Sequence, residues 1–442
     1  MIDHNRLLRF LGTAIDAGDP EASALASFEQ TAAVLRKASL EAGDAVLLAS
    51  THGLGTVGAF FAVLDAGLVP VPHGPGRDDR LLRAASALQC RAVATLSGTG
   101  LRPKIDLRHV PTPNHAQRPY RPGEVVLLTS GTSGIATGCV HDIDALLTNG
   151  LRHLRSLGIG TGHRTLVSLP LYFSFALVAQ VLAAFRSDSS IVLAPPPFTP
   201  TNFNAALSRY EIDVAALTPW LVRDLLSGDW QSPSSLRTLS VGGAQLPLDE
   251  VRRLRDRCNT TSLAITYGLT EAGPRVSTLL TDDVDDARLA SVGLPIEGVR
   301  VVSPTVPGEV RELIVHTDTA MKRRVGALRR NQHQEQRGTV HTGDMFSTDE
   351  DGYLFFHERH RDIIVHHGSK LNLRSVRQLV EESPLVVYSR TRPTLEGYAL
   401  DLFTQPTVDA SDSEISRSAL RRLTLRERPT QITVSRAERP HK

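Results

Sequence analysis

The chain has 442 residues, which is too many for one ordinary hydrophobic core and predicts two or three folded units. Apolar residues make up 41% of it, and 49 basic against 47 acidic side chains leave a net charge of +2, so composition gives no ground for a nucleic acid partner. We expect neither a signal peptide nor a membrane span, because the N-terminal residues lack an apolar core and no run of about 18 apolar residues occurs. Three widely separated cysteines favour a reducing compartment, and we expect a cytoplasmic protein.

Up to about residue 290, short apolar runs alternate with segments of helical periodicity. Strands are expected at 45–50, 68–72, 92–96, 165–168, 190–193, 214–217, 238–241 and 264–267. Helices are expected at 22–42, 55–66, 80–88, 174–185, 202–208, 221–226 and 248–257. Strands that alternate with helices in this way predict α/β units built on parallel sheets.

Beyond residue 290 the apolar runs become shorter and are divided by glycine, proline and charged residues. They predict antiparallel strands of a smaller β unit at 299–302, 310–316, 339–342 and 353–356. A strand at 363–365 begins a last region of mixed strands and helices, in which the polar segment 409–418 predicts a loop. Residues 416–442 carry eight basic and two acidic side chains, and form either a solvated surface or a docking site for an acidic partner or a phosphate group.

Residues 127–138 read Leu-Leu-Thr-Ser-Gly-Thr-Ser-Gly-Ile-Ala-Thr-Gly, two apolar residues followed by a loop of hydroxyl groups and glycines. Glycines let backbone N–H groups approach an anion closely, and serine and threonine hydroxyls add further donors. The loop therefore suits the phosphates of a nucleotide, although it has no Gly-Lys-Ser/Thr ending and is not a Walker A loop. The residues expected to hold phosphate are Thr129, Ser130, Gly131, Thr132, Ser133 and Gly134.

Three further motifs follow this loop along the chain. Residues 266–271 read Thr-Tyr-Gly-Leu-Thr-Glu, residues 341–344 read His-Thr-Gly-Asp, and residues 358–364 read Glu-Arg-His-Arg-Asp-Ile-Ile. One such motif alone would be weak, but four in this order resemble the adenylate-forming superfamily of acyl-CoA synthetases, adenylation domains of nonribosomal peptide synthetases and luciferases. Smaller matches extend the resemblance over most of the chain, at 66–72, 169–172 and 242–245.

The resemblance implies an α/β fold in two domains. A large N-terminal domain, built of parallel-sheet subdomains and a small β unit, would span 1–361, and a small mobile α+β lid domain would span 362–442, with Asp362 at the hinge. In this family the active site lies between the two domains. The implied reaction joins a carboxylate to the α-phosphate of ATP, which gives acyl-AMP and pyrophosphate, and then passes the acyl group to a thiol or an amine.

The resemblance also implies roles for the motif residues, and elementary chemistry agrees with them. Thr270 can donate a hydrogen bond to an α-phosphate oxygen, and Glu271 can hold Mg²⁺, which prefers carboxylate, water and phosphate oxygens. Asp344 can accept hydrogen bonds from both ribose hydroxyls. Further nucleotide contacts are implied for Tyr267, Gly268, Gly243, Ala244, Gln245 and Arg359. Residues 243–245 also fit a plain tight turn after the strand expected before them.

The acid is specified less well than the nucleotide. Relatives that activate amino acids place an aspartate in the segment after Pro170, where it pairs with the substrate ammonium, but residues 171–177 contain no acidic residue. Because an unpaired buried ammonium is unfavourable, we expect an acid other than an α-amino acid. The aromatic residues Tyr172, Phe173, Phe175 and Trp220 indicate an apolar or aryl pocket, and they fit a hydrophobic core equally well.

Two positions depart from the family pattern. The loop usually continues with Pro-Lys-Gly, whose lysine contacts pyrophosphate, but this chain has Ala-Thr-Gly with Thr137 in the place of the lysine. One phosphate contact is therefore lost, and Arg323 and Arg324 are candidate replacements. The family's catalytic lysine, which bridges the carboxylate and the α-phosphate, comes near the end of the small domain. Lys442 is the candidate here, and its alternative interpretation is a frayed terminal residue.

The main hypothesis is an ATP- and Mg²⁺-dependent, AMP-forming ligase that transfers a small-molecule carboxylic acid to the thiol of coenzyme A or of a carrier-protein phosphopantetheine. The basic C-terminal segment favours an acidic carrier protein as partner. A second hypothesis keeps the adenylation but uses an amine or another nucleophile as acceptor. A third, motivated by Thr137 and by the unusual setting of Lys442, is a protein that binds nucleotide or acid without turnover.

Overall fold

The computed structural model describes residues 3–50, 52–97, 104–110, 119–129, 137–194, 198–326, 337–359, 363–366, 369–394 and 397–436. By its internal contacts the chain divides into two units. The first consists of Met1–Glu309, Ile314–Thr342 and Thr348–Phe355, and the second of Val310–Leu313, Gly343–Ser347 and Phe356–Lys442. The boundary predicted after residue 361 lies outside the described residues and stays a prediction.

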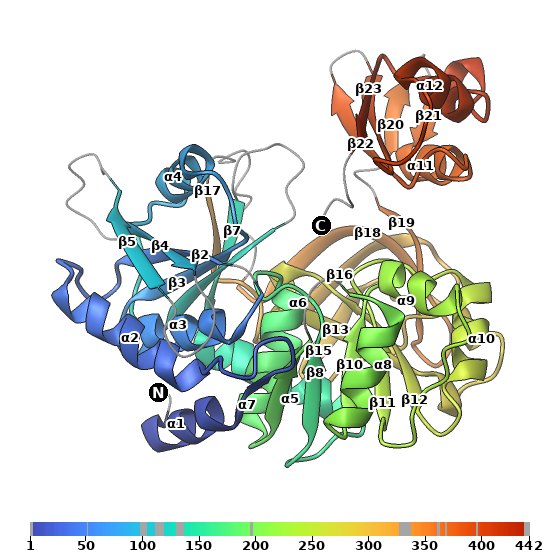
Figure 1. Ribbon diagram of the computed structural model, residues 1–442. Helices are drawn as coiled ribbons and strands as arrows, with labels where there is room; N and C mark the ends of the chain where they lie inside the picture. The colour runs from blue at the N-terminus through green and yellow to red at the C-terminus, as the bar shows by residue number, and fades with distance from the viewer. Residues whose placement is uncertain are drawn as a thin grey trace. The chain divides into compact units, whose positions relative to one another are not determined.

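The first unit begins with helices around a mainly parallel sheet, drawn in blue in Figure 1. Its strands have the order β3-β2-β4-β5, with parallel pairing from β3 to β4 and an antiparallel β5 at the edge. All five residues of β2 are buried, as expected for a strand covered on both faces. The elements are α1 (His4–Thr13), β1 (Ile15–Asp16), α2 (Ala24–Lys37), β2 (Ala45–Ala49), α3 (Leu54–Asp65), β3 (Val69–His73), α4 (Asp78–Ala87), β4 (Ala92–Ser97) and β5 (Lys104–His109).

The largest sheet of this unit has eight strands in the order β1-β9-β8-β10-β11-β12-β13-β14. Pairing is parallel from β1 to β12 and antiparallel for β13 and β14. The elements are α5 (Ile143–Ser156), β8 (Arg164–Val167), α6 (Ser174–Ala176), the π-helical η1 (Leu177–Leu182), α7 (Ala183–Arg186), β9 (Ser190–Leu193), α8 (Pro200–Arg209), β10 (Val214–Leu217), α9 (Pro219–Leu226), β11 (Thr238–Val241), α10 (Leu248–Arg257), β12 (Ser262–Gly268), β13 (Arg275–Leu280) and β14 (Leu294–Pro295).

The direction of the crossovers places helices on both faces of this sheet. The chain steps from β8 outward to β9, and then returns past β8 to β10, β11 and β12. Because parallel crossovers are right-handed, the helix that precedes β9 covers one face and α8, α9 and α10 cover the other. Figure 1 shows these last three helices side by side along the sheet.

Two smaller sheets complete the part of the chain before the last region. β6 (Glu124–Leu128) and β7 (Thr137–Asp142) form a hairpin, and β17 (Arg323–Gly326) adds to β7 in antiparallel pairing. The second sheet has the order β15-β16-β18-β19. Its strands are β15 (Val299–Ser303), β16 (Arg311–Thr317), β18 (Thr339–Thr348) and β19 (Leu354–Arg359). Strands β16, β18 and β19 give residues to both units.

The second unit contains its own hydrophobic core, with Tyr398, Val376 and Ile415 fully buried in it. A two-stranded sheet and a three-stranded sheet of order β22-β23-β24 are joined by helices. The elements are β20 (Ile363–His366), β21 (Ser369–Asn372), α11 (Leu373–Glu381), β22 (Tyr388–Thr394), β23 (Gly397–Thr404), α12 (Asp412–Leu420) and β24 (Gln431–Arg436). This combination is an α+β arrangement.

The predicted α/β fold is confirmed, and several predicted elements agree with the structure residue for residue, among them β10, β11 and α10. The loop predicted at 409–418 is wrong, because α12 occupies most of it. The Ser411 hydroxyl accepts a hydrogen bond from the Glu414 N–H, and the Glu414 carboxylate accepts one from the Ser411 N–H at 2.8 Å. This capping box starts the helix, and the burial of Ile415 and Ala419 holds it in place.

Helices α2 and α3 pack so closely that Gly58 has no room for a side chain. A Cβ atom added there would lie 2.2 Å from the carbonyl oxygen of Ala24 and 2.7 Å from the backbone nitrogen of Phe28. Both neighbouring atoms belong to the backbone of α2 and cannot move aside without moving the helix. The contact therefore fixes the distance between the two helices.

Replacement of Gly58 by alanine should force α2 and α3 apart and lower the free energy of unfolding by about 2 kcal/mol, a typical effect of overpacking. Gly12→Ala is the matched control, because Gly12 also lies in a helix but has no heavy atom within 4 Å of an added Cβ. We expect the control to keep or slightly raise stability. Urea unfolding of both variants tests this; equal stabilities would contradict the close contact.

Candidate active site

The carboxyl ends of three parallel strands meet at one edge of the eight-stranded sheet. β10, β11 and β12 pair in register, so that Leu217, Val241 and Ile265 lie beside one another. The predicted motif at 242–245 follows directly after β11, and the motif at 266–271 covers the end of β12 and the residues after it. Ligands of parallel α/β sheets bind at this edge. The structure thus brings these two motifs together.

Two glycines at this edge let neighbouring groups pack closely against the backbone. A Cβ atom on Gly242 would lie 2.5 Å from the Thr266 hydroxyl, and one on Gly268 would lie 2.1 Å from the carbonyl oxygen of Pro274. Any larger residue would therefore displace the backbone or the motif itself. Gly243 has a φ of 88°, in the left-handed region, and it turns the chain away from the strand towards Ala244 and Gln245, which are exposed.

Thr270 and Glu271 lie in a short 3₁₀ turn, η2 (Thr270–Ala272), directly after this edge. The hydroxyl of Thr270 is 3.2 Å from the hydroxyl of Ser174, at the start of α6. Arg324 on β17 donates a hydrogen bond from Nη1 to Oε1 of Glu271 at 2.8 Å. A hydroxyl pair, a carboxylate and a guanidinium from three distant segments therefore lie together in the first unit.

The base of the predicted phosphate loop is closed by two threonines. The Thr129 N–H donates to the carbonyl oxygen of Thr137 at 3.1 Å, and the two side-chain hydroxyls are 3.2 Å apart. Thr137 stands where the family has its lysine, and its side chain binds the other end of the loop. The position therefore contributes a neutral closing contact in place of a charge.

Arg323 is bound to a buried carboxylate. Its Nη1 and Nη2 donate to Oε1 and Oε2 of Glu124, both at 2.9 Å, and Nη2 also donates to the carbonyl oxygen of Pro119 at 2.6 Å. The Glu124 side chain is only 1% exposed, and Lys322 lies 3.3 Å from it. Burial alone would raise the pKa of Glu124, but hydrogen bonds from Arg323 and from the Arg121 N–H hold it below its usual value. Of the two candidate replacement cations, only Arg324 pairs with a predicted site residue.

The four aromatic residues predicted for the acid pocket occupy different surroundings. Phe175 lies on α6, where its ring is 4.3 Å from the guanidinium carbon of Arg275. The rings of Tyr172 and Phe173 have centroids 4.5 Å apart. The ring of Tyr172 packs beside Gly74, at the end of β3, and its burial raises the pKa of its hydroxyl. Trp220 lies in the first turn of α9, directly after β10.

Arg275 is the residue at this edge that the sequence patterns did not single out. It begins β13, and it pairs across the sheet with Gly268 of the Thr-Tyr-Gly motif. The side chain is buried and donates from Nη1 to the Thr266 hydroxyl at 3.0 Å. The sequence signal that could have identified it is a basic residue four positions after Glu271, in the strand that returns alongside the motif.

The two remaining motif residues, Asp344 and Arg359, belong to the second unit and are described apart from the first. Asp344 lies in β18 and is fully buried. The N–H of its neighbour Gly343 donates to the Glu312 carboxylate at 2.9 Å. Arg359 is the last residue of β19. Several predicted residues lie outside the described part of the chain: Ser130, Gly131, Thr132, Ser133, Gly134, Asp362 and Lys442.

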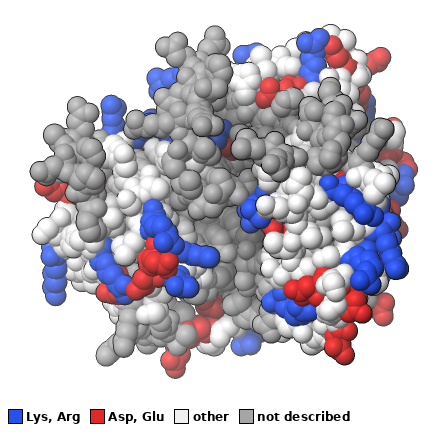
Figure 2. Space-filling model, turned by 90° about the horizontal axis from the view of Figure 1, so that it is seen from above, with Lys and Arg blue, Asp and Glu red and all other residues white. Residues whose placement is uncertain are grey.

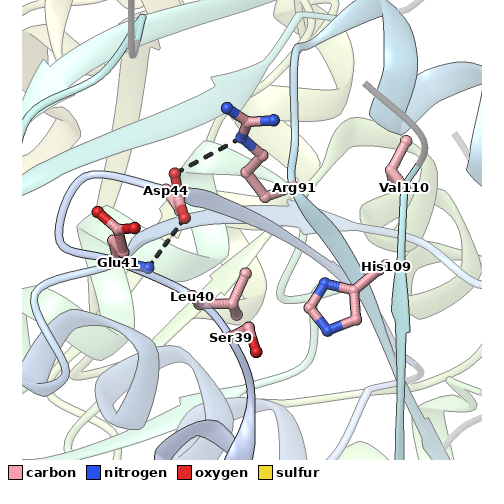
Figure 3. Close-up of a pocket in the computed structure, with 7 residues that line it drawn as sticks. All are labelled: Ser39, Leu40, Glu41, Asp44, Arg91, His109 and Val110. Carbon is pink, nitrogen blue, oxygen red and sulfur yellow. Dashed lines mark hydrogen bonds and ion pairs between the residues drawn. The ribbon is translucent and has the colours of Figure 1, made fainter. Parts of the chain in front are cut away.

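A separate cavity of about 230 Å³ lies beside the four-stranded sheet of the first unit (Figure 3). Asp44 is buried in its wall, accepts the Glu41 N–H at 2.9 Å, and lies 3.7 Å from Nε of Arg91. The lining residues are Ser39, Leu40, Glu41, Asp44, Arg91, His109 and Val110. None of them is a predicted site residue, so this cavity is not part of the candidate active site.

Comparison of the chain with known proteins agrees with this arrangement of the motifs. Residues 22–323 match the family described as AMP-binding enzyme, which is more than half of the chain. The chain therefore belongs to the AMP-binding enzyme family, and the predicted membership in the adenylate-forming group is confirmed.

Individual relatives are distant. A feruloyl-CoA synthase of Amycolatopsis sp is 29% identical over 258 residues, which are 56% of this chain and 51% of that protein, so the chain spans about half the length of this relative. A salicyl-AMP ligase / salicyl-S-ArCP synthetase of Mycobacterium tuberculosis is 28% identical over 401 residues, 81% of this chain and 70% of that protein.

Solved structures share the fold over almost the whole chain. The o-succinylbenzoate CoA synthetase MenE of Bacillus subtilis, in complex with the acyl-adenylate OSB-AMP, has a TM-score of 0.74 at 19% identity and covers 98% of this chain and 93% of its own. The amide bond synthetase McbA of Marinactinospora thermotolerans has a TM-score of 0.69 at 21% identity, and the match covers 98% of this chain and 95% of that protein. In the part of the chain that the structure describes, no helix is long and apolar enough to cross a membrane.

Arg323→Ala should leave the buried Glu124 carboxylate with Lys322 as its remaining cation and lower the free energy of unfolding by about 2 kcal/mol at neutral pH. Because pairing lowers the folded-state pKa of Glu124, its contribution is present above the ordinary value of 4.5 and is lost as the pH falls through the lowered pKa. The difference between wild type and variant in urea unfolding should therefore shrink as the pH falls below 4.5.

The exposed ion pair between Arg252 and Asp286 supplies the control for this experiment. Arg252→Ala should change stability far less, because exposed pairs are screened by solvent. Equal losses in the two variants, or a loss in Arg323→Ala that does not depend on pH, would contradict a structural role of the buried pair.

Proposed function

We propose that this protein is an AMP-forming ligase, which activates a small-molecule carboxylic acid other than an α-amino acid with ATP and then transfers the acyl group to a thiol. One arrangement carries the proposal: Thr270 and Glu271 lie at the carboxyl edge of the parallel strands, in contact with Ser174 and Arg324. A hydroxyl donor, a carboxylate and a guanidinium in one place suit a reaction between two anions. Membership in the AMP-binding enzyme family supports the same conclusion.

In the first half-reaction a carboxylate oxygen bonds to the α-phosphorus of ATP, while the bond from that phosphorus to the oxygen of the leaving pyrophosphate breaks. Both reactants are negatively charged, so catalysis consists mainly of neutralising and aligning them. Thr270 would donate to an α-phosphate oxygen. Arg324 would bring positive charge beside β7, the strand that carries Thr137 in place of the family lysine.

The site suits a magnesium ion that retains several coordinated water molecules. The described residues contain no group of three or more His, Cys, Asp or Glu side chains that could enclose a metal ion. Mg²⁺ commonly binds through one or two carboxylates together with substrate phosphates, and Glu271 would supply such a carboxylate. When bound, the ion would neutralise phosphate charge.

The surroundings of the aromatic residues support an acid without an ammonium group. The charged side chain that contacts Phe175 is Arg275, which would repel an ammonium. Residues 171–177 contain no carboxylate that could offset this repulsion. Tyr172, Phe173, Phe175 and Trp220 remain the proposed apolar lining of the acid pocket.

The remaining roles are proposals that follow the family. Tyr267, Gly268, Gly243, Ala244 and Gln245 would contact the adenine and the acyl group, since they lie at the same edge as Thr270. Asp344 would bind the ribose and Arg359 the ribose or phosphate. The loop residues from Thr129 to Gly134 would hold the terminal phosphates, Asp362 would act as hinge, and Lys442 would bridge the reacting groups.

Coenzyme A or a carrier-protein phosphopantetheine is the proposed acceptor, because relatives include a feruloyl-CoA synthase and a salicyl-S-ArCP synthetase. For an acidic carrier, the basic segment 416–442 is only partly available: Arg422 pairs with Glu382, and Arg436 pairs with Asp412. Basic and acidic side chains are also intermixed on the face seen in Figure 2. Coenzyme A is therefore the simpler acceptor.

A panel of carboxylic acids tests the proposed function directly. At least one acid should cause release of pyrophosphate from ATP, and acid plus coenzyme A should then give a thioester. If ATP binds but no acid supports release, the protein binds nucleotide without turnover, and the proposal fails. If release occurs but only an amine accepts the acyl group, adenylation stands and the thiol acceptor is wrong.

Glu271→Gln should lower the rate of adenylation by roughly 100-fold, because it removes the carboxylate proposed for magnesium. Glu250→Gln is the matched control, since Glu250 pairs with Arg223 on the helices away from the edge and should leave the rate unchanged. Raising the magnesium concentration should partly restore Glu271→Gln. A variant that keeps the wild-type rate would remove Glu271 from the site.

Thr137→Lys should restore the charge that the loop lacks and tighten ATP binding by roughly 10-fold, the effect of one hydrogen bond to a charged group. Thr137→Val removes the contact with the Thr129 hydroxyl without adding charge, and its effect on ATP binding should be small. Titration with ATP separates the two. Unchanged affinity in Thr137→Lys would show that position 137 does not face the phosphates.

A further inference from the structure

Arg275 is a buried cation at the edge where the acid would bind. Arg275 is 2% exposed, and it lies opposite Gly268 in the pairing of β12 with β13. The guanidinium lies close to the backbone at both strand ends: a Cβ atom on Gly242 would be 3.1 Å from Nη1, and one on Gly268 would be 2.8 Å from Nη2. The two glycines thus let this charged group pack against both strand ends.

The partners of Arg275 do not neutralise it. Nη1 donates to the Thr266 hydroxyl at 3.0 Å, and the guanidinium carbon lies 4.3 Å from the centre of the Phe175 ring. Nε has no hydrogen-bond partner within the described residues. Among those residues no carboxylate forms an ion pair with Arg275. Its backbone N–H and carbonyl oxygen are both hydrogen-bonded to the side-chain amide of Asn149.

The neighbouring titratable group is not a counter-ion either. His153 is buried, and burial together with the charge of Arg275 lowers its pKa to about 3, so it is neutral at physiological pH. Burial lowers the pKa of Arg275 itself to about 10, which leaves the guanidinium charged. The region around the Thr266–Gly268 motif therefore holds a positive charge that no described carboxylate balances.

A buried charge without a counter-ion is unfavourable, and proteins normally pair it or exclude it. Contact with Phe175 offsets part of the desolvation. An arginine with a purely structural role would be stabilised better by a neighbouring carboxylate or by exposure to solvent. Strongly perturbed, unpaired ionisable groups in such positions are typical of ligand-binding sites.

We propose that Arg275 binds a second anionic group of the acid substrate, so that the preferred substrate carries another carboxylate or a sulfonate besides the carboxylate that is activated. The inference rests on the proposed function and adds the substrate class to it. The first carboxylate reacts beside Thr270, and the second is held by the free Nε and the Nη atoms behind Gly242 and Gly268. The aromatic ring of Phe175 packs against the other side of the guanidinium.

Pairs of acids with one carbon framework test this proposal: benzoate against terephthalate, and hexanoate against adipate. Calorimetric titration of the full chain in the presence of AMP measures binding without requiring turnover. Wild type should bind the diacid of at least one pair roughly 10- to 100-fold more tightly than the monoacid, the effect of a charge-assisted hydrogen bond. Tighter binding of the monoacid in both pairs would overturn the proposal.

Arg275→Met removes the charge at similar length, and it should abolish the preference by weakening the diacid alone. Arg275→Lys keeps the charge and should retain part of the preference, while Arg252→Met on the exposed surface should behave as wild type. Equal weakening of monoacid and diacid in Arg275→Met would overturn the inference, because it would indicate a structural role or contact with the reacting carboxylate. Should Arg275→Met fail to fold, the diacid preference of the wild type and of Arg275→Lys still tests the proposal.

The outcome also separates this inference from the proposed function. Arg275-dependent binding of diacids without pyrophosphate release would leave the inference standing and refute the ligase. Release of pyrophosphate with monoacids and no discrimination by Arg275 would support the ligase and refute the inference.

Discussion

In-register pairing of β10, β11 and β12 is the constraint on which the site depends. β10 and β11 end at paired residues, and β12 continues past Ile265 to Gly268. The residues that follow the three strands therefore emerge at one edge: Thr218, Gly242 and the turn after Gly268. Glycines at two of these ends let the Arg275 guanidinium approach the backbone closely. Segments that are far apart in sequence, the start of α6 and the strand β17, then supply Ser174 and Arg324 to the same place.

The charges in the first unit serve two different purposes. The partly exposed guanidinium of Arg323 and the buried carboxylate of Glu124 neutralise one another. This pair joins β17 to the start of β6 and belongs to the framework. Arg324 pairs with Glu271 at the edge, and Arg275 lies behind it without a counter-ion among the described residues. Arg323 and Arg324, which are adjacent on β17, thus differ in role because successive side chains of a strand point to opposite faces.

Sequence reasoning succeeded where the information is local. A continuous apolar run located β10, since a strand covered on both faces contains little else. It failed at α12, whose helix has few apolar residues and whose best signal, the Ser411–Glu414 capping box, lies at its start. The motif singled out Thr270 and Glu271, whose roles stay predictions. It did not single out Arg275, because the burial of that side chain depends on Phe175 and Gly242 from distant segments.

The threonine pair at the base of the proposed phosphate loop affects how an anion bound there would respond to the solution. The contact between Thr129 and Thr137 joins two neutral groups, so dissolved ions do not screen it and protons do not remove it. A loop closed by a lysine would lose part of its attraction for an anion as ionic strength rises. In this chain, the salt dependence of anion binding there would report on other cations, among them Arg324 on the neighbouring strand β17.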